Sequence, residues 1–205
     1  MSDEHWEQVY SSKKADEVSW YQRQPEVSLR LVTAHAALSD AVIDVGAGQS
    51  LLIDALLDDG FTDVTVMDIS EVAMSEVRQR IDGQVSASFV VADVCTWAPT
   101  RNFDLWHDRA VFHFMKSAEE KAAYLSVMSR AVRPGGIALI GTFAEDGPTQ
   151  CSGLDVSRYS PMQLAIELEE FFELESTESE EHVTPWGAVQ HFTWVTLRRK
   201  MQFSS

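Results

Sequence analysis

The sequence predicts an α/β fold in which a doubly wound, mostly parallel sheet lies between two layers of helices. Two observations lead to this prediction. From about residue 41 to residue 171, short β-branched apolar runs alternate with segments of helical periodicity, as is typical of a parallel sheet covered on both faces. The chain then closes with two alternating segments around "VTPWG", which predict an antiparallel pair of strands.

The predicted elements can be taken in chain order. Residues 1–40 form a helical appendage, with Leu29, Val32, Ala36 and Leu38 near one face of a helix over 28–38. Buried strands follow at 41–45, 63–68, 86–93, 103–108 and 137–143. Helices lie between and after them at 50–60, 70–82, 117–132 and 160–171, and "RPGG" ends the third of these. The segment 144–159 is a long loop of the kind that is often functional.

Length, charge and cysteine content narrow the class of protein. The 205 residues suit one domain with a small appendage, and the 45% hydrophobic fraction supports a sizeable core. A formal net charge of -16 disfavours a nucleic-acid partner, because such binding depends on neutralising phosphates. No apolar run is long enough to span a membrane. Two cysteines without zinc-ligand spacing predict no metal site and favour a reducing cytoplasm.

The stretch "VIDVGAGQS" suggests what the domain binds. A buried strand ends near Asp44 and turns on Gly46 and Gly48. The third glycine of a dinucleotide-binding turn would fall at position 51, which is leucine, and a phosphate-loop G-K-[ST] is absent from the sequence. An acid at this turn repels a pyrophosphate but attracts a cation. The turn therefore indicates a ligand that combines a cationic group with an adenosine.

Two further strands also end in an acid. Asp68 ends "VTVMD", 20 residues after Gly48, which is the spacing expected of a carboxylate that holds a ribose diol. Asp93 ends "FVVAD", where it can accept a hydrogen bond from an adenine amine. Each acid alone is more simply a helix cap or a turn residue. Together with Asp44 they form one set at the carboxyl edge of the predicted sheet.

From about Ala41 to Arg198 the sequence resembles the class I S-adenosylmethionine-dependent methyltransferases. The resemblance is carried by "VIDVGAGQS", "VTVMDIS", "VVADV", "FDLWHDRAVFHF" and "RPGG". Ser50 stands where the family's first motif has a glycine, which is a mild departure. The resemblance implies seven strands, the last of them antiparallel, in a three-layer αβα sandwich. It also implies that residues 41–205 bind S-adenosylmethionine and that residues 1–40 form a helical cap or lid.

Carried over residue by residue, the resemblance gives each motif a role. It implies that Asp44, Gly46 and Gly48 lie beside the methionine moiety and that Asp68 binds the ribose hydroxyls. Ile69 would pack on the adenine, with Asp93 and Val94 at the adenine edge. His107 or Asp108 would lie beneath the methionine end. Trp20 and Tyr21, in the segment before the sheet, either close over the cofactor or pack on the core.

The acceptor is less clearly indicated. No Asn/Asp-Pro-Pro-aromatic run follows the fourth strand, which disfavours methylation of base amines. The segment "WHDRAVFHF" and the opening "HWEQVY" resemble two groups, one acting on thiols, thiopurines and chalcogen compounds and one on protein lysines, elongation-factor lysines among them. His107, Asp108 and His113 are candidate bases, and Arg109 could hold an anionic acceptor. Alternatively, His113 only packs in the core, and Asp108 and Arg109 form a structural ion pair.

The sequence thus predicts a methyltransferase that transfers a methyl group to a small molecule by in-line displacement. A thiol, a chalcogenide or a small anionic metabolite is the preferred acceptor class. Protein-lysine methylation is the alternative within enzymes, because a surface this acidic suits a basic protein. A module that binds the cofactor without catalysis is the alternative outside them.

Overall fold

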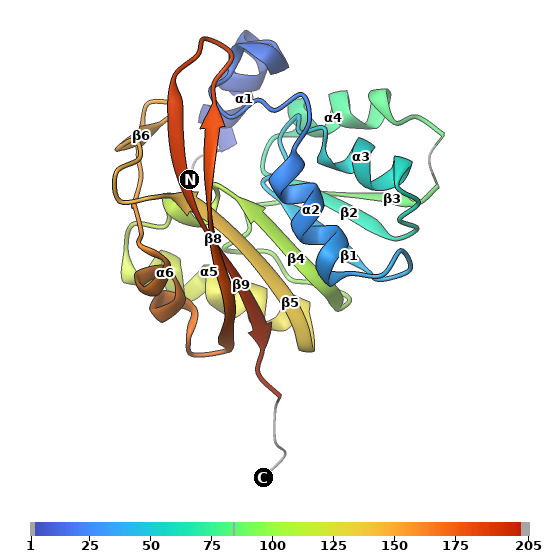
Figure 1. The fold of residues 1–205 in the computed structure, drawn as a ribbon. Coiled ribbons are helices and arrows are strands. Elements are labelled where there is room, and N and C mark those ends of the chain that lie inside the picture. Colours follow the sequence, from blue (N-terminus) through green and yellow to red (C-terminus); the bar gives the residue numbers. More distant parts are fainter. Residues whose placement is uncertain (1–2, 84, 202–205) are drawn as a thin grey trace.

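The computed structural model describes residues 3–83 and 85–201. Its centre is a seven-stranded sheet with the strand order β3-β2-β1-β4-β5-β9-β8 (Figure 1). The strands are β1 (Val42–Val45), β2 (Val64–Asp68), β3 (Ala87–Val91), β4 (Phe103–Arg109), β5 (Val132–Phe143), β8 (Phe172–Val183) and β9 (Val189–Arg199). The predicted α/β fold with a mostly parallel seven-stranded sheet is confirmed.

The closing pair of strands lies at the edge of the sheet, as predicted. The strands β1 to β5 pair in parallel, whereas β9 is antiparallel to both β5 and β8. Within this pair β9 lies between β5 and β8, and β8 forms the edge, because the chain passes β5 by one position and returns through a hairpin.

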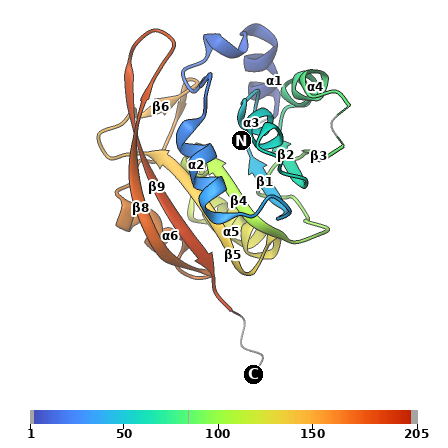
Figure 2. The ribbon, with the colours of Figure 1, turned by 45° about the vertical axis from the view of Figure 1, so that its right-hand side comes forward.

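Helices cover both faces of the sheet (Figures 1 and 2). The helices α2 (Glu26–His35) and α3 (Leu52–Asp58) lie on one face and α5 (Ala118–Ala131) and α6 (Pro161–Leu168) on the other, while α1 (Asp3–Ser12) lies against α4 (Glu71–Arg80). Serine caps open three of these helices. Ser70, Ser117 and Ser160 accept the backbone N–H three residues on, and Pro161 occupies the first turn of α6.

Three local predictions need correction. The predicted helix over 28–38 ends at His35, and its buried side chains are Ser28, Leu31 and Val32, while Leu38 is exposed. The pattern failed there because the chain leaves the helix in an extended conformation at Ala36, so the later apolar residues are out of phase. The motif "RPGG" lies within β5 and not before it. The long loop contains a short hairpin, β6 (Gln150–Cys151) and β7 (Leu154–Asp155).

One hydrophobic core joins the N-terminal segment to the sheet. Trp6, Val9 and Tyr10 of α1 and Leu31 and Val32 of α2 belong to the same buried cluster as the central strands. These buried contacts hold the described part of the N-terminal segment, residues 3–40, against the rest of the chain. None of the helices in the described ranges has the length and apolarity to cross a bilayer.

Candidate functional site

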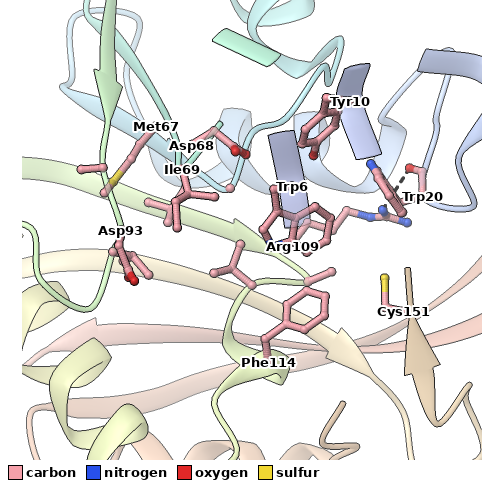
Figure 3. A pocket seen from close by; sticks show the side chains of 16 residues that line it. Trp6, Tyr10, Trp20, Met67, Asp68, Ile69, Asp93, Arg109, Phe114 and Cys151 are labelled. Carbon is pink, nitrogen blue, oxygen red and sulfur yellow. Dashed lines mark hydrogen bonds between the residues drawn. The ribbon is translucent and has the colours of Figure 1, made fainter. Parts of the chain in front are cut away.

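A cavity of about 650 Å³ opens at the carboxyl ends of β1, β2, β3 and β4. This is the edge where the strand order reverses between β1 and β4 and where α/β sheets bind their ligands. We call it the first cavity. In Figure 3, Asp68, Ile69 and Asp93 lie at one end, Trp20, Arg109 and Cys151 lie at the other, and Trp6 and Phe114 lie between them. The floor and walls are mostly apolar.

Asp68 organises the acidic end of the first cavity. Its carboxylate accepts the backbone N–H of Gly48 at 2.8 Å and that of Ser70 at 2.9 Å, so it ties the glycine turn to the end of β2. Burial raises the pKa of Asp68 to about 6, although these N–H groups act in the opposite direction. A ligand that donates hydrogen bonds would therefore meet a buried carboxylate already aimed by the backbone.

The glycines of the turn are required by close contacts. Gly46 and Gly48 both have positive φ angles, 65° and 52°. A Cβ on Gly46 would lie 1.9 Å from a methyl of Val111, and one on Gly48 would lie 2.3 Å from the hydroxyl of Tyr10. The turn thus keeps the backbone at the cavity wall, and Gly46 lines the first cavity directly.

The predicted adenine-side residues meet at the same end. Ile69, Asp93 and Val94 all line the first cavity. The carboxylate of Asp93 accepts the backbone N–H of Cys95 at 2.8 Å, which fixes the turn after β3. Two of the three predicted strand-end acids therefore line this compartment, whereas Asp44 does not.

A second cavity of about 550 Å³ adjoins the first on the α2 side of the sheet. Asp44 and His107 line it, and Gly46, Trp20 and Arg109 line both cavities. The carboxylate of Asp44 lies 2.7 Å from Nδ1 of His107, whose Nε2 lies 2.9 Å from the hydroxyl of Ser28. Both ring nitrogens of His107 are therefore engaged with protein groups.

Trp20 and Tyr21 are not placed alike. Trp20 lines both cavities, whereas Tyr21 lines the second but is absent from the lining of the first. Trp20 packs edge-to-face on Trp6, with ring centroids 5.9 Å apart. Trp20 therefore covers the junction of the two cavities, whereas Tyr21 borders the second cavity alone.

Asp108 and His113 lie elsewhere than predicted. Neither lines either cavity, although both are fully buried. Asp108 accepts the N–H groups of Val111 and Phe112 and the hydroxyl of Tyr124, so it holds the turn after β4 in place. Burial raises its pKa to about 6.

His113 packs against two phenylalanine rings, with its ring centroid 4.5 Å from that of Phe114 and 4.9 Å from that of Phe143. Burial, with a smaller effect of Arg109, lowers its pKa to about 3. This placement agrees with the packing interpretation of His113. The suggested ion pair between Asp108 and Arg109 does not form. Arg109 instead donates to Glu180 at 3.1 Å, because the two strand-end side chains point to different sides of the sheet.

Several residues that line the first cavity were not predicted from the sequence to be site residues. Trp6 and Tyr10 of α1 form the roof of the first cavity, and Val111, Phe114 and Cys151 complete its wall. Trp6 and Tyr10 are four residues apart in "HWEQVY", so their shared helix face was a signal that could have identified them. Cys151 has no comparable signal, because the β6–β7 hairpin brings it over the cavity from a distant part of the chain.

Comparison with known proteins agrees with this geometry. A family model described as a methyltransferase domain matches residues 42–136. Malonyl-acyl-carrier protein O-methyltransferase 2 of Ilyobacter polytropus is 22% identical over 136 residues, which are 66% of this chain and 51% of that protein. The chain thus spans about half the length of that curated relative.

Two solved structures share the fold over nearly the whole chain. One, described as the conversion of a disulfide bond into a thioacetal group during echinomycin biosynthesis, has a TM-score of 0.77 and 23% identity, covering 97% of this chain and 93% of its own. The other is the 1,6-didemethyltoxoflavin-N1-methyltransferase of Burkholderia thailandensis with bound 1,6-didemethyltoxoflavin and S-adenosylhomocysteine, with a TM-score of 0.67 and 22% identity over 94% and 81% of the two chains. The chain has the class I S-adenosylmethionine-dependent methyltransferase fold.

Proposed function

We propose that the protein is an S-adenosylmethionine-dependent methyltransferase that acts on a small molecule. The observation that carries this proposal is the compartment formed by Asp68, Ile69 and Asp93 beside the glycine turn. The methyltransferase-domain match over residues 42–136 supports it independently. So does the toxoflavin enzyme, a structural neighbour that holds S-adenosylhomocysteine and 1,6-didemethyltoxoflavin together.

The residues present fit this cofactor. Asp68 would accept the ribose hydroxyls, Ile69 would pack on the adenine, and Asp93 would accept its amine. Gly46, which lines both cavities and has no room for a side chain, would contact the methionine moiety, with Asp44 in the second cavity near its ammonium group. Bound there, S-adenosylmethionine would supply a methyl group activated by its sulfonium.

The chain's own contribution to transfer would be orientation and exclusion of water. The titratable residues that line the first cavity are Tyr10, Asp68, Asp93, Arg109 and Cys151. Asp68 and Asp93 lie at the adenosine end, and burial raises the pKa of Tyr10 well above its usual range and that of Cys151 to about 12. The acceptor end therefore offers no evident base, which favours a soft nucleophile such as a thiol or a chalcogenide.

Binding and transfer test the proposal in sequence. Calorimetry with S-adenosylhomocysteine should give a saturable heat, and Asp68→Ala should weaken binding by about 1–3 kcal/mol. The matched control is Asp58→Ala, an exposed acid at the end of α3, which should bind as the wild type does. Equal affinity of the wild type and Asp68→Ala would contradict the ribose contact.

Labelled donor incubated with a panel of thiols and selenols, and separately with a cell lysate, then identifies the acceptor class. Transfer to small thiols supports the proposal. Transfer to lysine side chains in the lysate would replace it with protein methylation, for which the net charge of -16 is the favouring observation. Cofactor binding without transfer to either would indicate a module that only binds the cofactor.

A further inference from the structure

Glu180 of β8 connects three parts of the chain behind the acceptor end of the first cavity. Its carboxylate accepts hydrogen bonds from Nη2 of Arg109 at 3.1 Å, from Nε1 of Trp194 at 2.7 Å and from Nε2 of Gln22 at 2.8 Å. Burial raises the pKa of Glu180, but the charge of Arg109 and the hydrogen bonds from Trp194 and Arg109 outweigh burial and hold the pKa below its ordinary value. Glu180 is therefore a buried anion at neutral pH. It lines neither of the two cavities and acts on them through Arg109.

Arg109 is held from several sides. Its guanidinium lies 4.3 Å from the centre of the Phe192 ring, and its Nη1 lies 3.4 Å from the backbone oxygen of Trp20 (Figure 3). Its side chain is 10% exposed, and its Nε–H is buried without a protein partner. The guanidinium thus lies where the two cavities meet, with its charge matched by Glu180.

The charges around this end exclude charged ligands. Arg109 and Glu180 cancel each other, and Cys151 is uncharged at neutral pH because burial raises the pKa of its thiol to about 12. An anion entering here loses its water and finds an arginine that is already neutralised, with Asp68 and Asp93 farther along the same cavity. A cation would lie beside the sulfonium of the proposed cofactor. An uncharged ligand meets neither penalty.

Aromatic rings line the first cavity next to this end. Trp6 packs edge-to-face on Phe114 with centroids 5.4 Å apart and on Trp20 at 5.9 Å, and Tyr10 lies 6.0 Å from Trp6. Rings arranged in this way present flat and edge surfaces to a planar ligand. These rings also bring donors of their own to the cavity, the indole N–H groups of Trp6 and Trp20 and the hydroxyl of Tyr10.

We propose that the acceptor is a planar aromatic molecule that carries no charge apart from the reacting atom, and that Glu180 sets this preference by neutralising Arg109. This inference rests on the proposed function and adds the substrate class. Arg109 contacts the acceptor, and Glu180 is a positioning residue that acts through it. A merely structural role of Glu180 would weaken the binding of all acceptors alike, whereas the proposed role changes their ranking by charge.

Two thioether ligands, one anionic and one uncharged, test the inference. Binding of 4-(methylthio)benzoate and of its methyl ester is measured by calorimetry, with and without S-adenosylhomocysteine. The wild type should bind the ester about tenfold more tightly than the acid, and Glu180→Gln should remove most of this preference. The matched control is Glu178→Gln, the same change two residues earlier on β8 at a carboxylate that pairs with Arg30 on the surface, and it should keep the wild-type ratio.

The inference is overturned by a wild type that binds the acid as well as the ester, by one that binds neither, or by an unchanged ratio in Glu180→Gln. The wild-type comparison keeps the test decisive even when Glu180→Gln does not fold. Failure of the proposed function has a different signature. In that case the ester binds with the expected preference, but labelled methyl groups are transferred to no acceptor.

Discussion

The affinity for S-adenosylhomocysteine should fall as the pH falls through 6, and Asp68 should be the reason. Burial raises the pKa of this carboxyl from 3.8 to about 6. Only the ionised form can accept both ribose hydroxyls while it also accepts the N–H groups of Gly48 and Ser70. At pH 5 about a tenth of the carboxyl groups are ionised, so the dissociation constant should be about tenfold larger than at pH 7.5. This corresponds to a loss of about 1.4 kcal/mol of binding free energy.

The stability of the folded protein should change with pH in the opposite direction to the ligand affinity. Because the pKa of Asp68 is higher in the folded protein than in the unfolded chain, the folded protein without ligand binds the extra proton, and its stability falls as the pH rises from about 4 to 6. Asp108 shows a shift of the same direction. A melting curve therefore cannot assign the effect to one residue, whereas a ligand titration can.

Calorimetric titrations from pH 5 to pH 7.5 are the assay. Asp68→Asn should bind more weakly at pH 7.5 and lose most of the pH dependence, while Asp58→Asn, with its exposed carboxyl, should keep the wild-type profile. A wild-type affinity that is constant over this range, or an Asp68→Asn profile that still follows the wild type, would refute the assigned role.

Three further variants test the packing around the site. Gly48→Ala should lower the free energy of unfolding by about 1–3 kcal/mol, since its Cβ would lie 2.3 Å from the hydroxyl of Tyr10 at a positive φ, and in chemical denaturation Tyr10→Phe should restore part of the loss. Asp108→Asn should lower the free energy of unfolding by about 2–3 kcal/mol in the same assay, because Asp108 accepts hydrogen bonds from two backbone N–H groups and from Tyr124. Its affinity for S-adenosylhomocysteine should stay near the wild-type value, because Asp108 lines neither of the two cavities. A large loss of affinity in a folded variant would argue against this. Glu7→Gln should speed ligand release in stopped-flow tryptophan fluorescence, since the Glu7 carboxylate ties α1 to the first N–H groups of α4; an unchanged rate would mean that α1 does not limit release.

The parts of the fold that were predictable are those fixed by local pattern. A strand such as Val64–Asp68 is buried on both faces and has a mostly apolar, β-branched sequence that ends in its acid. Parallel strands bring their carboxyl ends to one edge, so the meeting of Asp68, Asp93 and Gly46 at one cavity followed from sequence order alone. Their binding roles stay predictions until a ligand is measured.

The base candidates show where local pattern stops being informative. His107, Asp108 and Arg109 are consecutive on β4, and a strand sends successive side chains to opposite faces. His107 reaches the second cavity and Arg109 both cavities, whereas Asp108 points to Tyr124 on the other side. Motif resemblance locates this segment but does not determine which of its side chains reach the ligand, because that depends on the twist and the register of the strand.

The sequence could not predict that Glu180 neutralises Arg109, because the order of the strands in the sheet brings these two distant residues together. Arg109 pairs in register with Gly141 of β5, and Gly141 pairs with Trp194 of β9. A Cβ on Gly141 would lie 2.7 Å from the Trp194 ring, so the absence of a side chain there lets Trp194 lie over β5 and donate to Glu180 of the next strand. Because β9 is inserted between β5 and β8, a glutamate 71 residues from Arg109 becomes its partner. A chain that placed β8 beside β5 would have the same motifs but an arginine with a different partner, so the acceptor preference proposed here depends on strand order and not on motif content.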